Sequence, residues 1–287
     1  MLVIHHNKDL DGFSSGAIMK LKYPDSRLIG WDYTDPVPWA TIKEDEEVIM
    51  IDISFPMDDM IKLLNITNDK LTIIDHHVSF KKDFDTYEDD NKLKINYIYQ
   101  EGIAACELGW KWAFPEDAMP EAIKLLGEYD TWRQGDIERW NTQILPFQYY
   151  MRTVCVSVET FPYECLHVVG QWQFIANGCI SGKAILTYQE QQDFLACKRS
   201  AFIQEFKGLR AICLNTRFFS SNTLKSIYNP DLHDIMVGFE YNGKVWAVSL
   251  RSAKPEIDVS LIAKSKGGGG HKAAAGYESS SFENIFI

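Results

Sequence analysis

The feature that most constrains the fold is the alternation of short apolar runs with amphipathic stretches in the first half of the chain. The apolar runs predict strands and the amphipathic stretches predict helices. Such alternation favours an α/β domain in which helices flank both faces of a parallel sheet. The predicted strands are Leu2–His6, 47–53, Leu71–Asp75 and 93–99, and the predicted helices are 14–21, 57–64, 104–113 and 120–129.

The sequence pattern changes after residue 206. Apolar and polar residues alternate there over 209–214, 234–241 and 244–250. Between the last two runs, Asn242-Gly243 predicts a hairpin with a two-residue type I′ turn. We therefore expect a smaller, mixed α/β C-terminal domain with a largely antiparallel sheet. The predicted domains are 1–181 and 207–287, joined by a connecting helix at 182–206. The stretch 133–180 has a helical, aromatic-rich pattern that cannot be divided into separate helices.

Composition excludes several classes of protein. The chain has 287 residues, 46% of them apolar, and a net charge of −11, which argues against an extended surface for long duplex nucleic acid. No apolar run approaches the roughly 20 residues that span a bilayer, so we expect a soluble, cytoplasmic protein with no membrane partner. Six cysteines without CxxC spacing are predicted to be reduced thiols in the core.

Acidic residues and histidines follow several of the predicted elements of the first domain. Because ligands of parallel sheets bind beyond the carboxyl ends of the strands, these side chains are expected to meet at one edge of the sheet. Together they offer enough oxygen and nitrogen ligands for two divalent metal ions. The candidate metal ligands are His5, His6, Asp9, Asp11, Asp52, His76 and Asp130.

The segment from His5 to Asp11 leaves open which of its two histidines binds metal. Asp9 and Asp11 are two residues apart, so both carboxylates face the same side of an extended segment. The adjacent His5 and His6 must point to opposite sides, so one of them faces the carboxylates and the other has a structural or supporting role. Asp52 either caps the next helix or binds metal, and its central position suits a carboxylate that bridges two cations.

The segment Asp75-His76-His77 ends another predicted strand. Two adjacent histidines cannot face the same way from an extended backbone, and we assign His76 to metal and His77 to a phosphate group. A metal-bound imidazole needs an acceptor on its other nitrogen. Asp75 either supplies that acceptor or coordinates metal directly, and we group Asp75 with His77 as the candidate catalytic residues.

A glycine tract lies near the C-terminus, at Gly267–Gly270, and is followed by His271 and a run of small residues. Its composition is that of a flexible linker, but only eleven residues follow Gly276. The alternative is a loop whose backbone N–H groups surround an anion and whose small neighbours allow a helix to approach closely. Arg251 and His271 would then add charge-assisted hydrogen bonds to a terminal phosphate or carboxylate.

In this order the motifs resemble those of the DHH/DHHA1 phosphoesterase superfamily, which includes nano-RNase oligoribonucleases, cyclic-dinucleotide phosphodiesterases and RecJ-type exonucleases. The resemblance covers nearly the whole chain. Its motifs are His5 or His6 with Asp9-Leu10-Asp11-Gly12, then Asp52, Asp75-His76-His77, Asp130 and the glycine-rich 269–276.

The resemblance implies a pair of Mn²⁺ ions, with Mg²⁺ or Co²⁺ as possible substitutes, and with Asp52 as the bridging ligand. Histidine spacing in many members selects His5, while another group of members selects His6, and we favour His5. The family pattern also implies that His77 contacts phosphate in an active site in the interdomain cleft. The implied substrate-binding residues are Arg251, Gly268, Gly269, Gly270 and His271.

The expected activity is hydrolysis of short oligonucleotides, or of linear or cyclic dinucleotides, to nucleoside 5′-monophosphates through a water activated by two metals. Mixed imidazole and carboxylate ligands suit Mn²⁺ better than Mg²⁺. The alternatives are a nucleoside 3′,5′-bisphosphate phosphatase, a pyrophosphatase-like phosphomonoesterase and, from another class, a catalytically degenerate nucleotide-binding protein. A homodimer is compatible with the sequence, and base preference is left open.

Overall fold

The protein is described by a computed structural model that covers residues 1–91, 95–216, 219 and 222–286. It divides into two compact units, Met1–Leu186 and Thr187–Ile287, with the boundary inside the long helix α8, Gln171–Ser200. The predicted connecting helix, 182–206, was wrong at both ends. Residues at its C-terminal end instead form a strand, because a two-residue turn brings them into antiparallel pairing with the strand that follows.

The first unit contains a five-stranded, fully parallel sheet in the order β2-β1-β3-β4-β5. All four predicted strands are present, and the second is shorter than predicted. Residues 93 and 94 of the fourth predicted strand lie outside the described residues, and a strand at residues 27–31 was not predicted. The strands are β1 Leu2–His6, β2 Arg27–Trp31, β3 Val48–Ile51, β4 Leu71–Asp75 and β5 Asn96–Tyr99.

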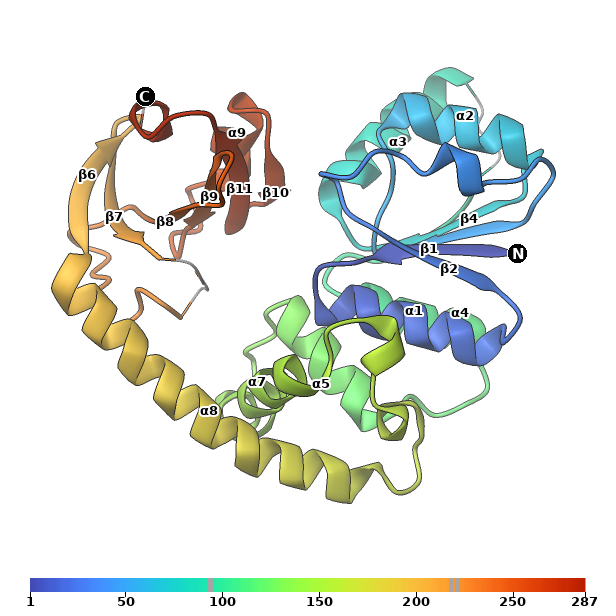
Figure 1. Cartoon of the computed structure of the whole chain (residues 1–287), viewed down its shortest axis with the longest axis horizontal. Helices are drawn as coiled ribbons and strands as arrows, with labels where there is room; N and C mark the ends of the chain where they lie inside the picture. The colour runs from blue at the N-terminus through green and yellow to red at the C-terminus, as the bar shows by residue number, and fades with distance from the viewer. Residues whose placement is uncertain (92–94, 217–218, 220–221, 287) are drawn as a thin grey trace. The chain divides into compact units, whose positions relative to one another are not determined.

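Helices cover both faces of this sheet, as predicted (Figure 1). On one face lie α1, Leu10–Lys22, and α4, Ala105–Ala113, and on the other lie α2, Met57–Thr67, and α3, Val78–Asn91. Alternate residues of each strand enter the two cores, so that Val3 packs with α1 while Leu2 packs with α2. The sequence did not predict α3, which is rich in charged residues.

A further group of helices packs beyond α1 and α4 (Figure 1) and includes most of the region that the sequence left undivided. It begins with α5, Glu121–Asp130, and continues through the short α6, Ile137–Arg139, and a π-helical stretch, Trp140–Ile144, into α7, Leu145–Val154. Short 3₁₀ turns lie at Trp39–Thr41, Val158–Thr160 and Tyr163–Leu166.

The second unit is built on a six-stranded mixed sheet in the order β10-β11-β9-β8-β7-β6, in which only β7 and β8 pair in parallel. The strands are β6 Phe202–Phe206, β7 Leu209–Asn215, β8 Ile235–Tyr241, β9 Trp246–Arg251, β10 Gly269–His271 and β11 Ala274–Ser279. Helix α9, Val259–Ser265, packs against one face together with the C-terminal 3₁₀ turn Glu283–Ile285.

One turn prediction in this unit was wrong. The strands on both sides of Asn242-Gly243 pair as a hairpin, as predicted, but these two residues do not form a two-residue turn. Instead β8 and β9 are joined by four residues, and the side chain of Asn242 accepts hydrogen bonds from the N–H groups of Lys244 and Val245. A two-residue turn with positive φ at both residues, 51° and 79°, lies at Lys207-Gly208, between β6 and β7.

The glycine tract is also not the predicted loop before a closely packed helix. Gly269–His271 is strand β10, and the small residues that follow form β11. A Cβ atom at Gly268 would lie 2.1 Å from the carbonyl oxygen of Gly276, and one at Gly270 would lie 2.6 Å from that of Ala274. These glycines therefore allow close approach between two strands.

All six cysteines are free thiols, and all but Cys179 are buried, in agreement with the sequence. Within the described ranges, no helix is both long and apolar enough to cross a bilayer.

Candidate metal centre

Five segments of the first unit bring acidic and histidine side chains together. They are the carboxyl ends of β1, β3 and β4, the start of α1 and the end of α5. The side chains form three overlapping groups that offer ligand atoms within 4.8 Å of one another. These groups are His6, Asp9 and Asp52; Asp11, His76 and Asp130; and Asp52, Asp75, His76 and His77.

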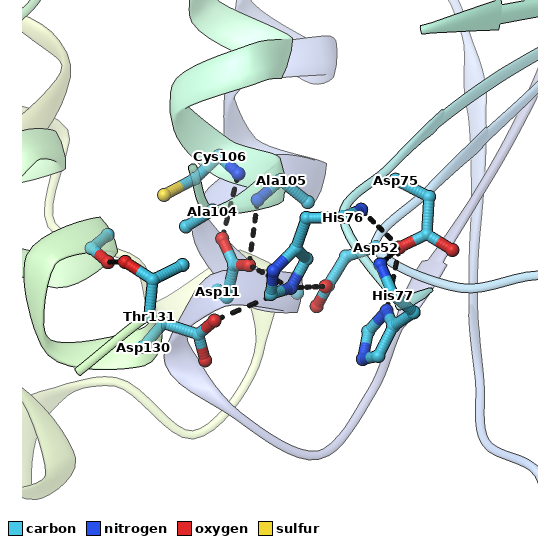
Figure 2. Close-up of polar contacts among 12 residues, drawn as sticks. Asp11, Asp52, Asp75, His76, His77, Ala104, Ala105, Cys106, Asp130 and Thr131 are labelled. Carbon is cyan, nitrogen blue, oxygen red and sulfur yellow. Dashed lines mark hydrogen bonds and ion pairs between the residues drawn. The ribbon is translucent and has the colours of Figure 1, made fainter. Parts of the chain in front are cut away.

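The ring of His76 is the centre of one group (Figure 2). Its Nε2 atom lies 3.5 Å from Asp11 Oδ2, 3.4 Å from Asp52 Oδ1 and 3.4 Å from Asp130 Oδ2. Ligands that share one ion at about 2.1 Å are themselves about 3 to 3.5 Å apart. The spacing of these atoms is therefore that of a coordination shell.

The ring of His6 is the centre of a second group. Its Nδ1 atom lies 3.2 Å from Asp9 Oδ2 and 3.5 Å from Asp52 Oδ2. The other oxygen of Asp9 accepts a hydrogen bond from the N–H of Gly12 at 2.9 Å and so caps α1. Gly12 is needed there because a Cβ atom would lie 2.1 Å from the carbonyl oxygen of His6. The helix start and the strand end are therefore held together.

Asp52 belongs to both groups. One carboxylate oxygen faces His76 and the other faces His6, at 3.4 Å and 3.5 Å. The residue is 2% exposed and has a φ of 63°, in the left-handed region that non-glycine residues adopt at a cost and that is enriched at functional sites. It has the placement of a carboxylate that bridges two cations.

His5 is not part of the centre, contrary to the choice that the sequence favoured. Its ring lies on the opposite side of β1, within 3.0 Å of where a Cβ atom of Gly16 would be, and its Nδ1 bonds to the carbonyl oxygen of His6 at 2.8 Å. Alternation along β1 puts only one of the two histidines at the carboxylates. The structure selects His6.

Asp75 orients His77 and not His76. Its Oδ1 atom accepts hydrogen bonds from the backbone N–H groups of His76 and His77, at 2.8 and 3.2 Å, and lies 2.7 Å from His77 Nδ1 (Figure 2). Asp75 is fully buried, whereas the side chain of His77 is 20% exposed. The pair thus presents an oriented imidazole at the edge of the metal groups.

Asp11 has a second role that the sequence did not predict. Its two oxygens accept hydrogen bonds from the backbone N–H groups of Ala105 and Cys106, at 2.9 and 2.7 Å (Figure 2). These groups belong to the first turn of α4, where unpaired N–H groups and the helix dipole favour a negative charge. Asp11 therefore connects the metal groups to a helix more than ninety residues away in the sequence.

Asp32 is a functional candidate that the sequence analysis missed. It follows β2 directly, and its Oδ1 atom lies 3.5 Å from Nε2 of His6, on the far side of the ring from Asp9 and Asp52. Thr34 donates a hydrogen bond to its other oxygen at 2.7 Å, and Lys8 lies 3.3 Å away. The signal was available, because Asp32 follows an apolar run just as Asp52 does.

The predicted substrate-binding residues lie in the second unit. The register places Arg251, Ala274 and His271 in one row across three strands, so Arg251 and His271 share a face of that sheet. The guanidinium of Arg251 lies 5.9 Å from the centroid of the Phe219 ring. Gly268, Gly269 and Gly270 run along the edge of the same sheet.

Solved structures show which fold this is. The DHH domain of a protein described as a member of a family of ribosomal proteins matches 97% of this chain and 82% of its own, with a TM-score of 0.59 and 16% identity. RecJ from Thermus thermophilus in complex with Mn²⁺ matches 99% of this chain and 50% of its own, with a TM-score of 0.51 and 14% identity. The chain has the DHH/DHHA1 fold.

Sequence comparison adds one relative. The uncharacterized protein R106 of Acanthamoeba polyphaga mimivirus is 23% identical over 278 residues, which are 95% of this chain. The match spans 57% of the length of that protein. No family model matches the chain.

The electrostatics of the candidate metal centre favour a bound positive charge. Burial alone would lower the pKa of His6, but the nearby carboxylates of Asp52 and Asp9 outweigh it and raise the pKa to about 11. Burial is likewise outweighed at His76, whose pKa is raised to about 10 by Asp52, Asp130 and Asp11. Burial and neighbouring carboxylates raise the pKa of Asp130 to about 7.

Two buried atoms of the candidate metal centre support metal binding directly. His6 Nδ1 and Asp52 Oδ2 face each other, and in the part of the chain that the structure describes neither makes a hydrogen bond. Buried polar atoms are normally satisfied, so an unsatisfied imidazole nitrogen beside an unsatisfied carboxylate oxygen indicates a missing partner. A divalent cation satisfies both, and the residues fit a pair of such ions.

Metal binding by the candidate centre should release protons. His6 and His76 both hold a ring proton at pH 7.5, because their pKa values are raised to about 11 and about 10, and each must lose it before the nitrogen can coordinate. Burial raises the pKa values of Asp11 and Asp130 as well, so calorimetric titration with Mn²⁺ in buffers of different ionisation enthalpy should show release of at least two protons per chain, and the affinity should rise with pH. Binding without proton release would contradict this assignment.

Asp32→Asn should weaken metal binding while leaving the other ligands in place. Asp32 faces Nε2 of His6, so it favours the tautomer that leaves Nδ1 available for a cation. Loss of a carboxylate that orients a ligand typically lowers metal affinity about 10- to 100-fold. Calorimetry with Mn²⁺ tests this, with Asp25→Asn, the same change at an exposed aspartate before β2, as the control. Equal affinity in the Asp32 variant and wild type would refute the role.

Proposed function

We propose that this chain is a metal-dependent phosphodiesterase that hydrolyses short oligonucleotides or dinucleotides to nucleoside 5′-monophosphates. The observation that carries the proposal is the placement of Asp52, whose two oxygens face imidazole nitrogens of two separate ligand groups. A shared carboxylate between two such groups is the arrangement of two-metal hydrolytic sites.

Each residue of the centre has a distinct task in this proposal. His6, Asp9 and Asp52 hold one cation, and Asp11, Asp52, His76 and Asp130 hold the other. When bound, the two cations supply an activated water and neutralise charge on the phosphate oxygens. Asp75 holds the ring of His77 at the edge of the centre, which suits His77 to contact a phosphate oxygen of the substrate.

The metal that we propose is Mn²⁺. The ligand set combines imidazole nitrogens with carboxylate oxygens, whereas Mg²⁺ prefers oxygen and water. The solved RecJ structure of the same fold is a complex with Mn²⁺. This neighbour supports use of a divalent metal.

The proposed substrate is short because the chain carries a net charge of −11, which opposes binding of a long polyanion. We assign recognition of its terminal phosphate to Arg251 and to His271 with the neighbouring backbone of Gly268, Gly269 and Gly270. Arg251 and His271 share one face of the second sheet, beside those glycines.

A substrate panel tests the proposal. The full chain with Mn²⁺ is incubated with a linear dinucleotide, a cyclic dinucleotide, a long single strand, a nucleoside 3′,5′-bisphosphate and pyrophosphate, and products are resolved by chromatography. We expect nucleoside 5′-monophosphates from the dinucleotides. Activity confined to the bisphosphate or to pyrophosphate would replace the proposal with a phosphomonoesterase or a pyrophosphatase, and no activity with any divalent metal would leave a nucleotide-binding protein.

A further inference from the structure

Helix α5 ends in an unusual way, directly after the candidate ligand Asp130. Trp132 has a φ of 55°, the N–H of Trp132 bonds to the carbonyl of Tyr129, and the N–H of Arg133 bonds to the carbonyl of Glu128 at 2.9 Å. A bond that spans five residues beyond a left-handed residue is a Schellman motif, whose left-handed position is normally glycine or asparagine. In α5 this position is a tryptophan.

Two other helices of this chain end in Schellman motifs with the usual residue types at the left-handed position. At the end of α2 the left-handed residue is Asn68, with φ 53°, and the next N–H bonds five residues back to Leu64. At the end of α9 it is Gly267, with φ 82°, and the next N–H bonds five residues back to Ala263. A bulky side chain in this conformation is sterically disfavoured, which points to a purpose for Trp132 other than ending the helix.

The contacts of Trp132 hold its indole in place while leaving much of it at the surface. Trp140 meets it edge to face, with ring centroids 4.8 Å apart and an angle of 69°, and Tyr129 lies 5.7 Å away at 71°. Trp140 is only 4% exposed, whereas Trp132 is 39% exposed. The buried ring of Trp140 thus packs against the exposed ring of Trp132 and holds it in place.

A cationic group belongs to the same cluster. The guanidinium of Arg152 lies 5.3 Å from the ring centroid of Tyr129 and donates a hydrogen bond to its hydroxyl at 3.1 Å. Trp132 is two residues from Asp130, so their Cα atoms are at most about 7.6 Å apart. The exposed indole thus extends from the same helix end as the candidate ligand Asp130, and its neighbour Tyr129 contacts a guanidinium. An aromatic ring and a guanidinium in one cluster suit a group with a flat ring next to a phosphate.

We propose that Trp132 is a substrate-binding residue on which a nucleobase next to the scissile phosphate stacks. This inference rests on the proposed function and deepens it, because it names the part of the substrate that the centre recognises besides phosphate. Stacking is tolerant of sequence, since every base has a π face. The site therefore favours nucleotides over base-free phosphodiesters without selecting one base.

The test compares a dinucleotide with the same molecule lacking its bases, using the full chain with Mn²⁺. In wild type we expect kcat/KM to be about 5- to 100-fold higher for the dinucleotide, the range of one base stacked on an aromatic ring. Trp132→Gly should lose most of this preference, and Trp132→Phe should keep part of it. Glycine suits the left-handed position, so the variant removes the indole without straining the helix end. Trp172→Ala, which removes another exposed indole, is the matched control.

A second measurement separates this inference from the proposed function. Stacking on Trp132 should quench the fluorescence of a 2-aminopurine dinucleotide on binding to wild type and not to Trp132→Gly. An unchanged substrate preference or unchanged quenching in Trp132→Gly would overturn the inference while leaving the phosphodiesterase intact. If wild type hydrolyses no dinucleotide, the proposed function fails, and quenching that depends on Trp132 would still support a base-binding site.

Discussion

Replacing Asp52 with asparagine should lower the metal-dependent activity about 10³-fold or more. Each oxygen of this carboxylate faces the imidazole of a different ligand group, at 3.4 and 3.5 Å, so one substitution removes a ligand from both cations. An asparagine side chain has one oxygen and no charge and cannot bridge them. Calorimetry should correspondingly show loss of at least one of the two Mn²⁺ binding events.

This substitution should leave the local backbone and packing unchanged, because asparagine tolerates the left-handed conformation that Asp52 adopts and has nearly the same shape as aspartate. The matched control is Asp69→Asn, which makes the same change at an exposed aspartate with φ 62°. We expect this control to keep wild-type activity and Mn²⁺ stoichiometry. Full activity in Asp52→Asn would remove the dinuclear assignment.

Replacing Asp11 with alanine should destabilise the first unit even without metal. The buried Asp11 carboxylate accepts two backbone hydrogen bonds at the start of α4, and alanine leaves both N–H groups without that acceptor. Burial and the neighbouring carboxylates raise the pKa of Asp11, so its charged form is itself disfavoured in the folded, metal-free protein. Loss of two hydrogen bonds at the helix start outweighs relief from that cost, so we expect the free energy of unfolding to fall by about 2 kcal/mol. Chemical denaturation in EDTA measures it.

Asp130→Ala is the matched comparison, because Asp130 lies in the same ligand group but caps no helix. Its pKa is raised to about 7, so its charged form destabilises the folded, metal-free protein, and this cost is present above pH 7 and disappears as pH falls toward 4. At pH 8 we therefore expect Asp130→Ala to be at least as stable as wild type in EDTA. Both variants should lose Mn²⁺ affinity. Equal destabilisation by both would show that the helix contact of Asp11 contributes nothing.

Much of the metal centre could be predicted from the sequence because its residues follow strands of a parallel sheet. Asp52 follows the apolar run 48–51, His76 lies one residue beyond the mostly apolar run 71–74, and parallel strands bring their carboxyl ends to one edge. The choice between His5 and His6 could not be made, since it depends on which face of β1 packs against α1. That is a property of the packed sheet and not of the local pattern.

What the sequence missed depends on contacts between distant segments. The contact of Asp11 with α4 forms only after the first unit has folded, and Asp32 was overlooked because β2 itself was not predicted. The glycine tract was misassigned because glycine serves anion loops and close strand pairing equally well, and only the register of β10 against β11 distinguishes them. The conformation of Trp132 likewise has no local sequence signal.

The most direct measurement is anomalous scattering at the manganese edge from crystals of the full chain grown with Mn²⁺. The account predicts two manganese peaks in the first unit, one bound by His6 and Asp9 and the other by Asp11, His76 and Asp130, with one oxygen of Asp52 on each. A single peak, two peaks that do not share Asp52, or a manganese ion bound by His5 in place of His6 would contradict it.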